Sequence, residues 1–178
     1  MKTFLVILAA ATSLFLPLHT YSQSTDISEL ETALRSAAGP QRVEVLLALT
    51  NAHLQAGDYD KALEYAENAT SLAERIKRND LVAVSLSREG KVLVLRGKKG
   101  LFAKDPASRF RESNKILGKS GNSDKTLLLE NLEQLRALAV RNNRNSEVAD
   151  IDAQIARAKE IAGPPPGLEL LVLEKQQE

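Results

Sequence analysis

Residues 57–65 read GDYDKALEY, and this stretch decides the fold. A glycine followed by acidic residues is a stop signal for one helix and a start signal for the next. Apolar residues recur at helical spacing on both sides, over residues 43–54 before the turn and over 62–76 after it. Two amphipathic helices joined by a short turn predict an antiparallel helical hairpin.

The rest of the chain repeats this pattern of helices and short polar turns. The sequence lacks sustained apolar–polar alternation and Asn-Gly hairpin turns, so no strands are expected. We predict seven helices and an all-α fold. The predicted helix starts are the capping-box pair Ser28 and Glu31, a start near Asp80, the cap and proline at Asp105-Pro106, a cap at Ser123 or Asp124 and a cap at Ser146. The predicted breaks and stops are at Gly39-Pro40, at the turn at Gly57, at Gly97, at Gly118 and at 163–167.

The hairpin at residues 46–69 resembles a tetratricopeptide repeat (TPR), a helix–turn–helix unit of about 34 residues. Ala62 stands at a small second-helix position of that family, and GDYDKALEY matches its turn. Two further hairpins align with larger spacings, since Gly97 follows Gly57 by 40 residues and Asn143 follows Gly97 by 46. The resemblance implies a TPR-like array of about three antiparallel helical hairpins, an α-solenoid, because one hairpin cannot bury its apolar face alone.

The resemblance also implies where a partner binds, because the first helices of TPR hairpins line the concave side of the array. The mixture of polar and apolar side chains at these positions suits an extended peptide or a helix. One position departs from the family pattern, since Glu89 stands where leucine is expected. The implied groove residues are Leu47, Asn51 and Gln55 in the first hairpin, Ser87, Lys91 and Val94 in the second, and Glu133 and Ala137 in the third.

The N-terminus predicts an export signal. Lys2 precedes an apolar run over residues 4–18, and a small residue at Ser22 suits cleavage before Gln23. This run is shorter than the roughly 20 residues that span a bilayer, although an uncleaved membrane anchor is the alternative. We expect a periplasmic or cell-envelope protein with no transmembrane span after cleavage. The predicted organisation is a signal peptide at 1–22, a TPR-like helical repeat domain at 23–162, a Pro/Gly hinge at 163–167 and a short helical tail at 168–178.

Catalytic and metal chemistry is not expected. The chain has no cysteine and only two histidines, which excludes disulfides, thiolate metal sites and a cysteine nucleophile. No carboxylate has a histidine or serine at a spacing typical of catalysis, and the stretch Gly118-Lys119-Ser120 lacks the first glycine of a phosphate-binding loop. We therefore predict that the protein is not an enzyme and holds no cofactor and no metal ion.

Charge is distributed along the chain in blocks. Residues 26–74 carry 3 basic and 9 acidic side chains, residues 75–119 carry 13 and 4, and residues 120–178 carry 7 and 10. The central net charge of +9 predicts either a solvated surface or a docking patch for an acidic protein, peptide or membrane surface. Nucleic acid is not expected as a partner, because an exported chain does not meet it and the block holds only two aromatic residues for base stacking. The proposed patch centres on Lys98, Lys99 and Lys104.

Three functions fit this sequence. The first is an exported scaffold that mediates protein–protein interaction through the concave groove. The second follows from a wider resemblance, because a signal peptide, divergent repeats and a helical exit segment are similar to the N-terminal sensory region of bacterial two-component histidine kinases. In that case residues 168–172 would transmit the signal by pairing with their copy in a homodimer, although no kinase element is present. The third is a periplasmic structural protein without a ligand, whose concave face would be apolar and filled.

Overall fold

The computed structural model describes residues 26–97, 104–119 and 124–162. These residues form seven α-helices and no strand, which confirms the all-α fold class. The predicted signal peptide, Pro/Gly hinge and C-terminal tail lie outside the described residues. The helices are α1 (Ile27–Ser36), α2 (Gly39–Gln55), α3 (Tyr59–Arg75), α4 (Asn79–Arg96), α5 (Pro106–Leu117), α6 (Lys125–Arg141) and α7 (Asn145–Ala162).

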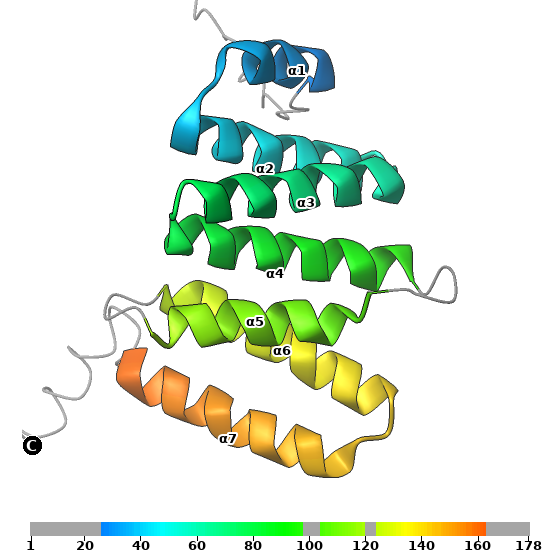
Figure 1. Ribbon diagram of the computed structural model, residues 1–178. Helices are drawn as coiled ribbons and strands as arrows, with labels where there is room; N and C mark the ends of the chain where they lie inside the picture. Colours follow the sequence, from blue (N-terminus) through cyan, green and yellow to red (C-terminus); the bar gives the residue numbers. More distant parts are fainter. Residues whose placement is uncertain (1–25, 98–103, 120–123, 163–178) are drawn as a thin grey trace, which may run out of the picture.

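The helices stack in chain order, and each one packs against the next (Figure 1). Consecutive helices of the stack run in opposite directions, because the connections lie at alternating ends. In addition, α2 contacts α4, and α4 contacts α6. Within the described ranges the backbones of α3 and α5, and of α5 and α7, do not come as close. The helices α2, α4 and α6 therefore form a continuous row along one side of the stack, called here the α2–α4–α6 row.

Three of the turns share one backbone geometry. At the end of α2 the Asp58 N–H donates to the His53 carbonyl at 2.9 Å. Equivalent bonds close α3 and α6, and Gly57, Lys77 and Asn143 all adopt the left-handed conformation there. This closure satisfies carbonyl groups that the end of each helix leaves free. α2 begins at Gly39 and α4 at Asn79, so the first hairpin and its connection to the next take 40 residues, more than the roughly 34 of a tetratricopeptide repeat.

Aspartate side chains hold several helix starts in place. The caps at Asp105 and Asp124 confirm the predicted starts of α5 and α6, since each carboxylate accepts a hydrogen bond from a backbone N–H of the first turn. Asp58 caps α3 in the same way, within the stretch that decides the fold. These caps are properties of the local sequence, which is why they could be predicted.

Three predicted helix boundaries are wrong. Asp26, and not Ser28, caps α1, because its carboxylate accepts the Ser28 N–H at 2.9 Å and aspartate is as good a cap as serine. Gly39-Pro40 begins α2 instead of ending α1, because proline lacks an N–H and suits the first helical turn. Ser146 lies inside α7, because the helical backbone already begins at Asn145.

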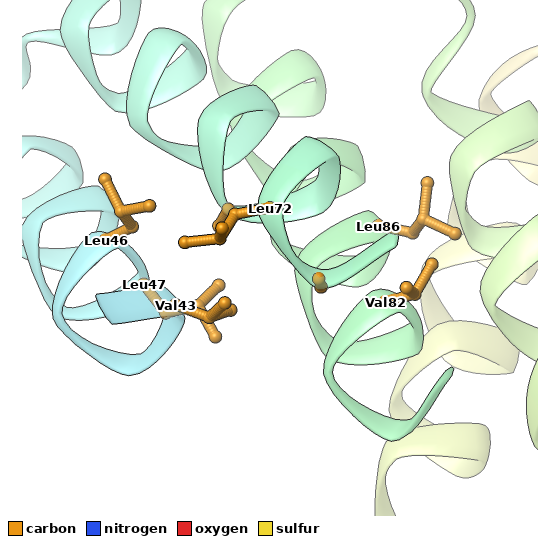
Figure 2. Packing of buried hydrophobic residues seen from close by; sticks show 8 residues of the cluster. Val43, Leu46, Leu47, Leu72, Val82 and Leu86 are labelled. Carbon is orange, nitrogen blue, oxygen red and sulfur yellow. The ribbon is translucent and has the colours of Figure 1, made fainter. Parts of the chain in front are cut away.

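The apolar core follows the stack from one end to the other. Figure 2 shows its first part, where Val43, Leu46 and Leu47 of α2 lie near Leu72 of α3, with two residues of α4 beyond them. A second cluster around Phe110 joins α5, α6 and α7. A small third cluster links α4, α5 and α6. Each helix is therefore stabilised by its neighbours in the stack and not by one central core.

We expect Ala62→Leu to lower the free energy of unfolding by roughly 1–3 kcal/mol through overpacking. Ala62 is 0% exposed, as are three other alanines of α3. These small side chains let α3 approach its neighbours closely, so a larger one has no room. Chemical denaturation measures the change, with Ala153→Leu at an exposed position of α7 as the control. Equal stability of the two variants would contradict the prediction.

Candidate functional site

The α2–α4–α6 row carries the residues that were predicted to line a groove. Lys91 of α4 is partly buried, and its Nζ lies 2.8 Å from Oε2 of Glu130 on α6. Val94 is also partly buried and packs against the cluster around Phe110. The other four accessible positions offer amide, carboxylate and small apolar groups to solvent. They are Asn51 and Gln55 of α2 and Glu133 and Ala137 of α6.

Two of the predicted groove residues are not on the surface, which corrects the prediction. Leu47 is buried in the same apolar cluster that Leu34 of α1 packs against, so an N-terminal helix helps to cover this end of the row. Ser87 is 0% exposed, and its hydroxyl donates to Oδ1 of Asn131 on α6 at 2.6 Å. Neither side chain is free to contact a partner, because the packing of the stack covers both.

Asn131 is the centre of a buried polar cluster that the sequence analysis missed. Its Oδ1 accepts the Ser87 hydroxyl, and its Nδ2 donates to Oγ of Ser113 and to Oδ1 of Asn114, both at 2.9 Å. The Ser113 hydroxyl in turn donates to the Ala83 carbonyl at 2.7 Å. The cluster ties α4, α5 and α6 together. The available signal was an asparagine on the apolar stripe of α6, where every polar atom must find a partner.

Glu89, the departure from the family pattern, is a buried carboxylate with partners on two neighbouring helices. It is 3% exposed, and its Oε1 accepts the Thr70 hydroxyl of α3 at 2.5 Å. Its Oε2 lies 3.2 Å from Nε of Arg109 on α5. Burial raises the pKa of Glu89, while Thr70, Arg109 and Lys104 act in the opposite direction and Glu67 adds to the increase. The group therefore joins three helices at a cost in desolvation.

We expect Glu89→Gln to change the pH dependence of stability. Because folding raises the pKa of Glu89, the wild-type chain loses stability as pH rises from about 4.3, the ordinary glutamate value, through the folded pKa. The variant does not lose stability in this way. The difference between its free energy of unfolding and that of the wild type should therefore increase as pH rises from about 4.3 to the folded pKa of Glu89, and should then level off. Urea unfolding at pH 4 to 8 measures it, with the exposed Glu133→Gln as the matched control. A constant difference across this range would contradict the prediction.

Part of the central basic block pairs with carboxylates inside the molecule. Four of its cations form ion pairs with the acidic blocks before and after it in the chain. Charges that the sequence separates into blocks therefore meet between stacked helices, each exposed pair contributing about 1 kcal/mol or less. Of the proposed docking patch, Lys104 is in one of these pairs, and Lys98 and Lys99 lie outside the described residues. The pairs are Arg96 with Asp60 at 2.6 Å, Lys104 with Glu67 at 2.7 Å, Lys91 with Glu130 at 2.8 Å, and Arg111 with Glu147.

A cavity of about 370 Å³ lies where α4 and α6 end and where α5 and α7 begin; it is called here the end cavity. Buried apolar side chains from three of these helices form part of its wall. Four basic and two acidic side chains also line it. No sequence pattern indicates this cavity, because the helix ends that form it are far apart in the chain. The apolar residues are Leu93, Pro106, Ala107, Leu135, Leu138 and Ala139, and the charged ones are Lys104, Asp105, Arg111, Arg141, Arg144 and Glu147.

His53 occupies a packing position. It is buried, its ring stacks on that of Tyr65 with centroids 5.3 Å apart, and its Nδ1 lies 3.7 Å from a carboxylate oxygen of Asp58. In the part of the chain that the structure describes, no group of three or more histidine, cysteine or acidic side chains could hold a metal ion. Over the same residues, none of the helices has the length and apolar character needed to cross a membrane.

The chain matches no protein-family model, no curated protein and no solved structure.

Proposed function

We propose that the chain is an exported, TPR-like α-solenoid scaffold that holds another protein on the α2–α4–α6 row. The observation that carries the proposal is the one-sided contact pattern of the stack. Within the described residues the backbones of the first helices of successive hairpins approach one another, whereas those of α3 and α5, and of α5 and α7, lie further apart. The side chains of Arg111 and Glu147 bridge the wider separation between α5 and α7. A stack whose helices approach on one side and separate on the other curves toward the close side, as solenoids with concave binding faces do.

The chemistry of this row supports a protein or peptide partner. Its exposed groups combine hydrogen-bonding side chains at Asn51 and Gln55 with a carboxylate at Glu133. Large apolar side chains are exposed near the ends of two of its helices, Leu95 of α4 at 56% and Val140 of α6 at 50%. Apolar anchors beside hydrogen-bonding groups are the means by which grooves hold extended peptides or helices.

The test compares two pairs of substitutions in the full chain. A partner is captured by cross-linking in intact cells, purified, and its affinity is measured for each variant. Asn51→Arg with Gln55→Arg places two bulky cations on the row and should weaken binding about tenfold or more. Asn68→Arg with Ser71→Arg places the same charges on exposed positions of α3 and should leave it unchanged. Equal affinities of the two double variants would contradict the proposed surface.

Export gives a separate prediction. The mature chain is expected to begin at Gln23 and to be recovered outside the cytoplasm, because an apolar run behind Lys2 and a small residue at Ser22 precede it. N-terminal sequencing of the protein from fractionated cells measures this. Leu8→Arg interrupts the apolar run and should leave an intact Met1 inside the cell. An intact Met1 on the wild-type chain from the cytoplasm would contradict the export signal.

A further inference from the structure

The end cavity has an excess of positive charge. Its lining carries four basic and two acidic side chains, net +2. Three of the four cations have carboxylate partners, since Glu147 pairs with Arg111 and, at 3.3 Å, with Arg144, and Lys104 pairs with Glu67 outside the lining. Of the two acidic groups, Glu147 is thus shared between two arginines, and Asp105 accepts the Ala107 N–H at 3.2 Å. The exposed guanidinium of Arg141, in the last turn of α6, adds to the rim. Among the described residues no ion pair is found for Arg141, and Arg111 and Arg144 share one carboxylate, so a negatively charged group entering beside these arginines is attracted.

The other part of the cavity wall is apolar. It is formed by Leu93 of α4 and by Leu135 and Leu138 of α6, which pack in the stack and leave at most 6% of each side chain exposed. The volume of about 370 Å³ lies at the lower end of the roughly 300–1,000 Å³ found for ligand pockets. The cavity is thus suited to a few apolar side chains attached to one or two carboxylates, which is the chemistry of a short acidic, leucine-rich peptide.

The chain itself contains such a peptide. Residues 168–178 read LELLVLEKQQE, with five apolar side chains and three glutamates against one lysine, net −2. We propose that the end cavity binds this segment of the same molecule, with leucine side chains against the apolar wall and glutamates at the basic rim. This goes beyond the scaffold function, because the cavity and the α2–α4–α6 row present different exposed residues.

The segment can reach the cavity. The first turn of α7 contributes Glu147 to the lining, and the whole helix is 18 residues, about 27 Å, long and ends at Ala162. The 16 residues at 163–178 can span up to roughly 50 Å when extended, so the chain can return along the whole length of α7. Attachment to α7 also gives the segment a high effective concentration at the cavity, which favours binding within the molecule over binding between molecules.

Because the chain has no cysteine, two spin labels can be placed cleanly in the full-length protein. Asn145→Cys marks the rim at an exposed residue beside the cavity, and Gln176→Cys marks the segment outside its apolar run. Electron–electron distance measurement is expected to give a short, narrow distribution at low salt. High salt should lower the docked fraction, since exposed charges are screened beyond about 3 Å at 1 M.

Reversing the charge of two arginines that line the end cavity tests whether the segment docks there. Arg141→Glu with Arg144→Glu is expected to lower the ratio of docked to free segment about tenfold. Arg35→Glu with Arg75→Glu, which reverses exposed last-turn arginines of α1 and α3 outside the cavity, should leave the ratio unchanged. Thermal melts establish that both variants fold. If the cavity variant does not fold, Leu171→Asp with Leu173→Asp tests the proposal from the segment and should abolish the short distance.

Three results would overturn the proposal. The first is a broad, long distance in the wild-type chain. The second is a short distance that disappears on dilution with unlabelled chain, because the occupant is then the segment of a second copy. The third is a short distance that both double variants retain, because the segment then docks elsewhere. None of these results bears on partner binding, which is measured through Asn51 and Gln55, so the two proposals fail separately.

Discussion

Replacing Phe110 with alanine is expected to lower the free energy of unfolding by about 3–5 kcal/mol. Phe110 is 0% exposed and belongs to the cluster that joins α5, α6 and α7. Its ring also faces Gly90 of α4, so closely that a Cβ built on that glycine would lie 2.7 Å from the ring carbon Cε1. Removing the ring leaves a cavity among four helices. The loss is a large part of the 5–15 kcal/mol that typically stabilises a domain.

A second substitution tests whether the close contact between Phe110 and Gly90 sets the spacing of the helices. Gly90→Ala alone should destabilise the protein, because the buried ring cannot move away from the added methyl group. In the Phe110→Ala background the same change should be neutral or stabilising, because the space is open and alanine favours a helix over glycine by about 1 kcal/mol. Urea unfolding of the four proteins gives the coupling free energy. An identical effect of Gly90→Ala in both backgrounds would show that the ring does not set the helix spacing.

Asn131→Asp is expected to cost about 3 kcal/mol or more at neutral pH. The wild-type amide donates to Ser113 and to Asn114, each at 2.9 Å, and accepts from Ser87. A carboxylate has almost the same shape but cannot donate, so it faces the amide oxygen of Asn114 with a negative charge inside the core. The cost therefore comes from lost hydrogen bonds and from burial of a charge, with little change in packing.

The same variant should recover stability in acid. Burial raises the pKa of the new carboxyl in the folded state, so the folded chain binds the proton more tightly than the unfolded chain. The deficit should be smallest below about pH 4, near the ordinary aspartate pKa, and should grow as pH rises through the folded pKa. Thermal melts over pH 3.5 to 8 measure this, with Asn68→Asp on the exposed side of α3 as the control. A deficit that does not depend on pH would contradict the assigned role of Asn131.

The helices and their turns could be predicted because they depend on residues close together in the chain. The turn at Gly57 and the caps at Asp105 and Asp124 are formed by a few consecutive residues, and each is found where the sequence indicates it. The break at Gly39-Pro40 was misread because a glycine–proline pair can end one helix or begin another. Here the pair begins α2, whose apolar side chains then pack on α3 and α4.

Exposure along the α2–α4–α6 row could be predicted only in part. The resemblance to the TPR family implies that Ser87 lines the groove beside Lys91, but it carries no information about a hydrogen bond to Asn131, 44 residues further on. Glu89 was recognised as a departure from a family pattern, and the reason for it is Thr70 of α3 and Arg109 of α5. Such partners depend on how far each helix is shifted and rotated against the next.

The sequence by itself determined that the chain is helical, where most helices begin and end, and which faces are apolar, because periodicity and capping act within one or two turns. Only the tertiary structure decided which charges neutralise one another and where a cavity remains. Asp60 meets Arg96 across 36 positions of the chain, and the ends of α4 and α6 enclose the end cavity with the starts of α5 and α7. Helix stacking over the whole chain sets these distances, and no local pattern contains that information.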